Sequence, residues 1–194
     1  NGVEEDKISV LPNAVDSSKF NIAPKDKKLE SELGFEGKVV IGYIGSFVEY
    51  EGLDLLLEAC SILKEKHGDI FRLLLVGDGD TMQLLRRTAR FLQLEDQVVF
   101  TGRIPHDDVQ RYYSLIDIAP LPRKGLRVCE LVSPLKPFEA MGAGKVLITS
   151  SVQALAEIVQ DGITGMIFEK DNSEDLAAKL ETAILDEELR KSIG

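Results

Sequence analysis

The 194-residue sequence predicts an α/β fold with a doubly wound, mostly parallel, Rossmann-like sheet. Short apolar runs alternate with amphipathic helical stretches along the chain, and this alternation is typical of such sheets. Most of the runs are continuously apolar, as expected for strands buried on both faces. Hydrophobic residues make up 44% of the chain, which is enough to build a core. We therefore expect one domain over residues 1–194, with ligand-binding loops at the carboxyl ends of its strands.

Seven strands are expected, because seven short apolar runs are separated by helical stretches or turns. In chain order they are Ile8–Leu11, Val39–Ile44, Arg72–Val76, Val98–Thr101, Ile116–Pro120, Val146–Thr149 and Met166–Phe168. Residues 14–37 are polar, and we expect them to form a surface excursion between the first two strands.

Six helices are expected between and after these strands. They are Gly52–Lys66, Thr81–Leu92, Asp107–Ser114, Pro134–Ala143, Leu155–Gln160 and Ser173–Leu185. In the first helix, Leu53, Leu57 and Cys60 recur at three- and four-residue steps, so they should face the core. Asn172 or Ser173 can cap the last helix.

The composition argues against several classes of protein. A formal net charge of -10 is unsuited to general nucleic-acid binding, which needs a broad basic face. The two cysteines form no Cys-x-x-Cys pair, so a reducing, cytoplasmic compartment fits best. No apolar run reaches the roughly 18 residues of a membrane-spanning helix, and no signal peptide is visible. The chain opens on Asn1-Gly2 and closes inside a helical pattern, so we expect a fragment of a longer protein.

The loop between the fifth strand and the fourth helix carries the strongest functional signal. It gathers Arg123, Lys124, Arg127 and Lys136 against a single acid, Glu130, and so runs against the net charge of the chain. Cations beside the N-terminus of a helix suit a phosphate, because the exposed N–H groups and the helix dipole also favour an anion there. We therefore expect an anionic ligand at this loop.

The helix after this loop begins with a cation and a carboxylate close together. Pro134 and Pro137 fix its start within 134–137, since proline is tolerated only in the first turn. Glu139 lies three residues after Lys136, and its carboxylate can accept two sugar hydroxyls while the cation holds phosphate. This arrangement suits a nucleotide-sugar. The alternative is a solvated lysine and an exposed helix acid.

Two glycine-containing loops follow the second and fourth strands. Gly45-Ser46 lets a ligand approach the backbone closely, although a tight turn with nothing bound fits the same residues. After Gly102, backbone groups of Arg103 and Ile104 could read the edge of a base. The alternative for Arg103 is an arginine in a surface loop.

Other polar motifs favour structural roles or exclude chemistry. The glycines after the second strand do not form the dinucleotide fingerprint G-x-G-x-x-G, and Glu49 and Glu51 would repel a pyrophosphate. Asp80 is expected to cap the helix that follows the turn Gly77–Gly79. The chain has two histidines and no acidic partner for them at ligand spacing, so we expect no metal site.

Taken in order, these motifs resemble the C-terminal, donor-binding domain of the family 4 (group 1) glycosyltransferases, which have the two-domain GT-B fold. The resemblance covers essentially the whole chain. The Pro134-Leu-Lys-Pro-Phe-Glu-Ala-Met141 form is similar to a subgroup linked to exopolysaccharide and other surface-glycan synthesis. The matching motifs are Pro12-Asn13-Ala14-Val15-Asp16, Gly42–Gly45, Gly77-Asp78-Gly79, Phe100-Thr101-Gly102, Lys136–Glu139 and Glu157 with Asp161-Gly162 and Thr164-Gly165.

The resemblance implies a role for each matching residue. Glu139 matches the second glutamate of the family's E-x7-E motif, which holds the ribose hydroxyls of the donor. Arg103 and Ile104 match the segment whose backbone meets the base, and Gly45 matches a glycine near the diphosphate. The expected donor-binding residues are Glu139, Gly45, Ser46, Arg103, Ile104, Ser133, Leu135, Glu130 and Arg123, and the expected catalytic cations are Lys136 and Arg127.

The chain also departs from the family pattern. Leu131 stands where the first glutamate of E-x7-E belongs, with Glu130 one place early. Ser46 and Glu51 stand at or near positions where the family often carries an arginine and a lysine. The diphosphate charge must then be met elsewhere. Three cations are available for that purpose, namely Lys136, Arg127 and Arg123.

Two hypotheses about function follow. The first is the donor half of a retaining, metal-independent glycosyltransferase without a cofactor, with a UDP-sugar as the leading donor. Its partners would be its own N-terminal domain, a glycan or lipid-linked acceptor and, through that missing domain, the membrane surface. The second is a non-catalytic nucleotide- or phosphosugar-binding module, which Leu131 and Glu51 favour slightly. A redox domain is disfavoured because the dinucleotide fingerprint is absent.

Overall fold

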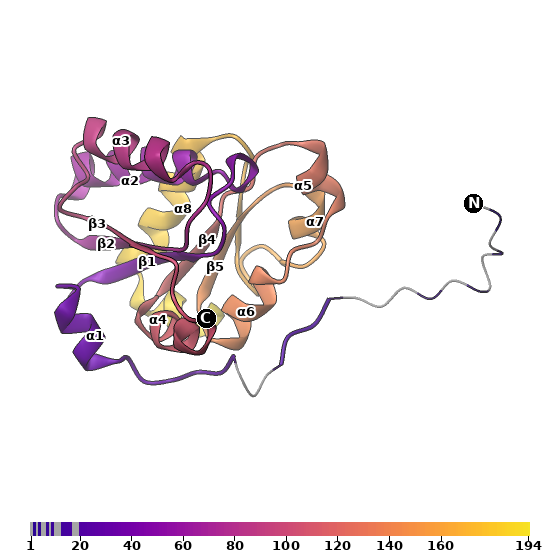
Figure 1. Cartoon of the computed structure of the whole chain (residues 1–194), viewed down its shortest axis with the longest axis horizontal. Helices are drawn as coiled ribbons and strands as arrows, with labels where there is room; N and C mark the ends of the chain where they lie inside the picture. Colours follow the sequence, from indigo (N-terminus) through magenta and orange to yellow (C-terminus); the bar gives the residue numbers. More distant parts are fainter. Residues whose placement is uncertain (1, 3, 5–6, 8, 10–12, 17–19) are drawn as a thin grey trace.

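The computed structural model describes residues 2, 4, 7, 9, 13–16 and 20–194. Its centre is a six-stranded sheet in the order β3-β2-β1-β4-β5-β6, and all neighbouring strands pair in parallel (Figure 1). This is the α/β, Rossmann-like fold that the sequence predicts. The strands are β1 (Val39–Ile44), β2 (Phe71–Val76), β3 (Val98–Gly102), β4 (Ile118–Leu121), β5 (Val146–Ser150) and β6 (Met166–Phe168).

The sheet grows outward from β1 in two directions. On one side β1 pairs with β2, in a register that places Val39 opposite Phe71. On its other side β1 pairs with β4, where Ile41 lies opposite Ile118. The helix that follows β1 and the helix that leads into β5 lie on opposite faces of the sheet (Figure 1). This arrangement opens a crevice between the carboxyl ends of β1 and β4.

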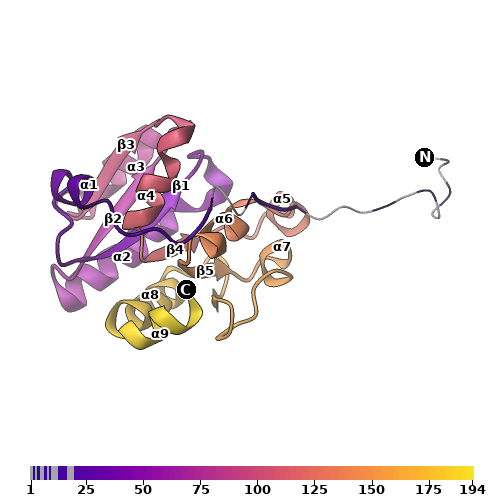
Figure 2. The same cartoon turned by 90° about the horizontal axis from the view of Figure 1, so that it is seen from below.

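Helices cover both faces of the sheet. Figure 1 shows α2 and α3 above the sheet and α4 and α6 below it, and Figure 2 shows the same layers from below. The last long helix, α8, packs against α2. The α-helices are α1 (Lys27–Glu32), α2 (Leu53–His67), α3 (Met82–Phe91), α4 (Val109–Leu115), α5 (Arg127–Leu131), α6 (Lys136–Gly142), α7 (Gln153–Ala156), α8 (Ser173–Leu185) and α9 (Glu187–Ile193), with 3-10 turns at Glu49–Glu51 and His106–Asp108.

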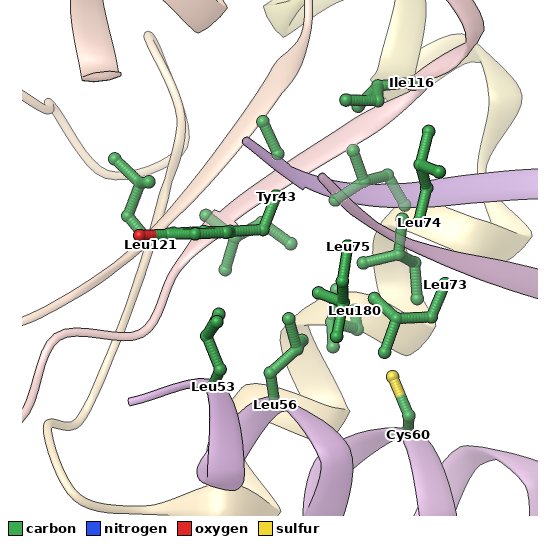
Figure 3. Packing of buried hydrophobic residues seen from close by; sticks show 14 of the residues in the cluster. Tyr43, Leu53, Leu56, Cys60, Leu73, Leu74, Leu75, Ile116, Leu121 and Leu180 are labelled. Atoms are coloured by element: carbon green, nitrogen blue, oxygen red, sulfur yellow. The ribbon is translucent and has the colours of Figure 1, made fainter. Parts of the chain in front are cut away.

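The core lies between the sheet and its helices. Figure 3 shows Leu73, Leu74 and Leu75 of β2 among buried apolar side chains from α2 and α8. Consecutive residues of one strand can all be buried only when both faces of the sheet are covered. Cys60, on the inner side of α2, is fully buried, as its place in the apolar pattern predicts. Among the described residues, no helix combines the length and apolarity needed to cross a membrane.

Most of the elements expected from the sequence are present. The second expected strand and the last expected helix have the predicted bounds. The side chain of Asn172 caps α8 by accepting a hydrogen bond from the Asp175 amide at 3.0 Å. The first expected strand, Ile8–Leu11, lies outside the described residues apart from Ser9.

The expectation for residues 14–37 was wrong in part. This stretch contains α1, whose first amides are capped by Asp26 through a hydrogen bond from the Leu29 amide at 3.0 Å. Leu29 and Phe35 are buried, and Phe20 packs edge-on against Tyr113 with 5.9 Å between ring centroids. A helix of six residues is too short to show a clear apolar period.

The expected helix Leu155–Gln160 was displaced, because α7 ends at Ala156. Side chains in the following turn take the backbone donors instead: the Gln160 amide donates to Thr164 Oγ1 at 2.9 Å, and the Ile167 amide to Asp161 Oδ1 at 2.7 Å. Such local bonds compete with helix formation. Asp80 does not cap α3, which begins after Thr81 without a side-chain cap.

Candidate functional site

A cleft of about 450 Å³ opens at the carboxyl ends of β1 and β4, at the crevice described above. We call it the switch-point cleft. A smaller hollow of about 280 Å³ continues from it toward the ends of β2 and β3 and shares Ile44, Gly45 and Ser46 with it. The cleft is lined by Phe20, Ile44, Gly45, Ser46, Tyr50, Glu51, His106, Val109, Arg123, Pro134, Leu135, Lys136 and Glu139.

The backbone after β1 and the backbone after β2 each have one position where only glycine fits, Gly45 and Gly77. Gly45 has a φ of 155°, and a Cβ added there would lie 2.5 Å from Lys136 Cε. Gly77 has a φ of 133°, and its added Cβ would lie 1.8 Å from the Gly45 carbonyl oxygen. The absence of these side chains therefore lets the loop after β2 support the floor of the cleft and lets Lys136 cross above Gly45.

The helix α6 presents Lys136 and Glu139 to the cleft. It begins at Lys136, with Leu135 as its N-cap residue and Pro137 in its first turn, as the two prolines predict. Positions three apart lie on the same side of a helix, so the ammonium and the carboxylate face the same space. Both side chains are partly buried, and both line the cleft.

Glu51 holds two cations at the floor of the cleft. One oxygen of its carboxylate, Oε1, accepts hydrogen bonds from Arg123 Nη2 and from Lys136 Nζ, each at 3.0 Å. The side chain of Glu51 is only 3% exposed, and that of Arg123 is 8% exposed. The sequence did not reveal that Glu51 is the counter-ion of two residues expected to bind the ligand, Arg123 and Lys136.

The electrostatics of this cluster favour ionised groups. Burial acts to raise the pKa of the Glu51 carboxyl, but the charge of Lys136 and the bonds from Arg123 outweigh it and keep the pKa below its ordinary value. Burial and then the Glu51 charge raise the pKa of Tyr43, so the phenol stays neutral. Tyr43 also places its ring 5.5 Å from Lys136 Nζ, within the range of a cation–π contact. The cleft lining thus carries two cations, Arg123 and Lys136, and two carboxylates, Glu51 and Glu139.

Glu139 has a partner that the sequence did not reveal. The hydroxyl of Tyr113, in α4, donates to Glu139 Oε2 at 3.1 Å. Burial and the Glu139 charge raise the pKa of Tyr113, so this hydroxyl keeps its proton. Tyr113 lies on the apolar face of its helix, and this position predicts a core residue. Only its hydroxyl suggests a second role. A carboxylate offers about four acceptor positions, so Glu139 can still receive hydrogen bonds from a ligand.

The segment after β3 borders the adjoining hollow. Arg103 and Ile104 line this hollow together with Gly45 and Ser46. The Arg103 side chain is 83% exposed and lies 3.8 Å from Asp78, so it is a loosely held surface arginine. Ile104 is partly buried and packs against the core, so its backbone is fixed more firmly than that side chain.

Three residues expected at the ligand line neither the cleft nor the adjoining hollow. Arg127 is exposed in the first turn of α5. Glu130 turns away from the cleft, accepting from Lys170 Nζ at 2.6 Å and from the Gln153 amide at 2.7 Å. Ser133 is exposed, and its carbonyl accepts from the Asn13 side chain at 2.8 Å. Of the four loop cations, Lys124 is paired with Asp54 at 2.6 Å, which leaves Arg123 and Lys136 facing the cleft.

The described residues also bear on metal binding. Within ranges 13–16 and 20–194, and at the isolated described positions before them, no three His, Cys, Asp or Glu side chains converge on a point where a metal ion could sit. The charged side chains of the cleft lining, Glu51, Arg123, Lys136 and Glu139, include only two carboxylates.

Comparison with known proteins identifies a family. The model of the family described as glycosyl transferases group 1 matches residues 24–194. Among curated relatives, the amylovoran biosynthesis glycosyltransferase AmsK of Erwinia amylovora is 27% identical over 180 residues, which cover 92% of this chain and 42% of AmsK. The chain thus spans less than half the length of that relative.

Two solved structures share the fold. The C-terminal domain of the group 1 glycosyl transferase LpcC from Francisella tularensis matches with a TM-score of 0.79 and 23% identity, over 93% of this chain and 92% of that domain. HepE from Anabaena, crystallised with UDP and glucose, matches with a TM-score of 0.80 and 24% identity, over 99% of this chain and 51% of HepE. The first match aligns this chain with nearly all of a C-terminal domain.

Proposed function

Since the chain belongs to the glycosyl transferases of group 1, we propose that it binds a nucleoside-diphosphate sugar as the donor domain of a retaining glycosyltransferase. The switch-point cleft is the donor site in this proposal. A UDP-sugar is the first donor to test, and the capture of UDP and glucose by HepE supports that choice. The family membership and the resemblance of the motifs support retention at the anomeric carbon.

The observation that carries the proposal is the pair Lys136 and Glu139 on one side of α6, inside the cleft. Ribose offers two neighbouring hydroxyls, and the Glu139 carboxylate can accept from both while it keeps its bond from Tyr113. One helical turn earlier, the Lys136 ammonium would bind the phosphates. The base would then extend toward Ile104, in the adjoining hollow.

Catalysis in this proposal is electrostatic. As the bond between sugar and diphosphate breaks, negative charge grows on the leaving phosphate, and a cation fixed beside it lowers the barrier. Lys136 fills this role, with the buried Arg123 behind it. Arg127 would take part only if a second domain brought the donor and α5 closer together. The phosphate charge is met by side chains, so EDTA should leave binding unchanged.

The remaining partners lie outside the cleft. We propose that an N-terminal domain supplies the acceptor site and closes over the donor, which excludes water from the reaction. The acceptor would be a glycan or a lipid-linked sugar in surface-glycan synthesis, in the cytoplasm. The part played by the relative AmsK in amylovoran biosynthesis supports this class of product. Any contact with the membrane surface would be made through the N-terminal domain.

A second candidate is a non-catalytic module that binds nucleotides or phosphosugars. Leu131 favours it, because this side chain is 68% exposed where the family pattern places a glutamate. The pairing of both cleft cations with Glu51 also favours it, since the pairing weakens their hold on phosphate. Both candidates share the nucleotide site and differ only in sugar transfer.

Calorimetric titration of the chain with UDP, GDP and ADP tests the shared site. Saturable binding of one nucleotide in preference to the others is expected, with a dissociation constant on the order of 0.1–1 mM because half the site is absent. Repeating the titration in EDTA tests the role of the side-chain cations. Absence of saturable binding by all three nucleotides rejects both candidates, and a strict requirement for Mg²⁺ rejects the proposed phosphate site.

A further inference from the structure

We propose that Glu51 is an internal counter-anion that competes with the donor's phosphate for Lys136 and thereby weakens the hold of the site on the nucleoside diphosphate. This inference rests on the proposed function, because it concerns the same cleft. Glu51 thus lowers the affinity of the site for the nucleoside diphosphate, whereas a residue that binds the ligand raises it. Glu51 sets how readily the leaving nucleoside diphosphate departs after transfer.

The geometry separates a fixed partner of Glu51 from an exchangeable one. Arg123 is 8% exposed and also donates from Nη1 to the Val132 carbonyl at 2.9 Å, so it is held on two sides. Lys136 is 20% exposed, lines the cleft and has no other hydrogen bond among the described residues. A phosphate entering the cleft therefore meets Lys136 first, while Arg123 stays with the carboxylate.

The carboxylate remains a complete negative charge close to the phosphate position. Its second oxygen, Oε2, is buried and accepts no hydrogen bond from the described residues. The charge is therefore shared between two cations through a single oxygen atom. Lys136 Nζ has three donors, so it can turn toward a phosphate, but each approach of the phosphate is opposed by the fixed negative charge of Glu51.

A purely structural role for Glu51 predicts that a variant without its charge binds phosphate more weakly. If Glu51 served only to hold Lys136 in place, removal of its charge would free the lysine and weaken phosphate binding. Competition predicts that removal of the charge strengthens binding, because both cations become available and a repulsion disappears. The sign of the change in affinity separates the two roles.

Glu51→Gln is the direct test, because it removes the charge and keeps the shape of the side chain. We expect UDP and inorganic pyrophosphate each to bind the variant about three- to tenfold more tightly than the parent, with a steeper dependence on salt. Glu181→Gln is the matched control. It removes one negative charge that also pairs with two groups, Lys66 and His67, but it lies in α8 outside the cleft lining. Its affinity for both ligands should equal that of the parent.

A double-mutant comparison locates the effect. In a Lys136→Met background the gain from Glu51→Gln should fall to less than half, because the cation for which Glu51 competes is gone. If Glu51→Gln alone does not fold, Glu51→Gln with Arg123→Met leaves no buried charge unpaired, and it should bind pyrophosphate more tightly than Arg123→Met alone.

The outcomes divide clearly. The competition is overturned if folded Glu51→Gln binds no more tightly than the parent. It is also overturned if the double variant Glu51→Gln with Arg123→Met binds no more tightly than Arg123→Met alone. An equal gain in Glu181→Gln would show a general effect of net charge and would also overturn it. Failure of the parent to bind UDP defeats the proposed function itself, whereas binding by the parent without a gain in Glu51→Gln defeats only this inference.

Discussion

The two short helices α5 and α6 are neighbours in the chain, carry similar charges and have different surroundings. In α6, Lys136 and Glu139 line the cleft and contact buried partners, Glu51 and Tyr113. In α5, Arg127 is exposed and Glu130 is bound to Lys170 and to the amide that opens α7. Charge type and closeness to a motif therefore do not place a side chain in a site. The element that the helix packs against decides where the side chain points.

The largest expected effect concerns the whole cleft. If α6 supplies only half of a divided site, the 194-residue chain should fold but transfer no sugar. Adding an upstream domain should restore transfer with retention at the anomeric carbon. Product formation from a UDP-sugar, with and without that domain, measures this. Turnover by the chain alone would show that the α6 side is sufficient, and a longer protein that binds donor without transfer would favour the non-catalytic module.

The next effect compares the two glutamates. Glu139→Gln should weaken UDP binding by about 1.5–3 kcal/mol, because a charged acceptor for ribose hydroxyls is lost. It should weaken pyrophosphate binding much less, since pyrophosphate has no ribose. Glu130→Gln is the control from α5 and should change neither affinity. Equal losses of UDP and pyrophosphate in Glu139→Gln would show that this carboxylate does not face ribose.

The cations of the two helices give a smaller contrast. Lys136→Met should weaken UDP and pyrophosphate binding by about tenfold and reduce the dependence of affinity on salt. Arg127→Met should change both affinities less than twofold in this chain, because exposed charges are screened. Titrations at two salt concentrations measure both variants. A larger loss in Arg127→Met would move the phosphate toward α5 and contradict the proposed site.

The smallest expected effect is on the pH dependence of stability. The pKa of Glu51 is depressed below its ordinary value of 4.5, so its stabilising contribution is present above that pH and is lost as the pH falls through the folded-state pKa. Unfolding of the parent by urea should therefore become easier between about pH 4.5 and pH 3. Glu51→Gln should lack part of this loss. Parallel curves for the parent and Glu51→Gln would contradict the pairing in solution.

The sequence predicted the sheet and the start of α6 because both depend on local rules. Continuous apolar runs give buried parallel strands, and two prolines limit where α6 can begin. The same rules predicted the end of β1 at Ile44. These features follow from the preferences of residues close together in the chain.

The pairings within the cleft could not be predicted in this way. Glu51 and Lys136 are 85 positions apart, and Tyr113 and Glu139 are 26 apart, on different elements. Read alone, Glu51 is an acid beside a glycine, and its burial becomes evident only when the loop after β1 packs against the loop after β4. The short helices α1 and α5 were missed for a related reason, since each has too few residues to show a period.

The position of β1 at the middle of the sheet has a consequence for the order of folding. Its pairing with β2 joins Ile41 to Leu73, whereas its pairing with β4 joins the same residue to Ile118, much further along the chain. Closing the longer loop costs more chain entropy and slows assembly. The strands β1 to β3 can therefore associate before β4 arrives. Nucleotide binding should then appear only in the last phase of refolding, after most of the helical signal has returned.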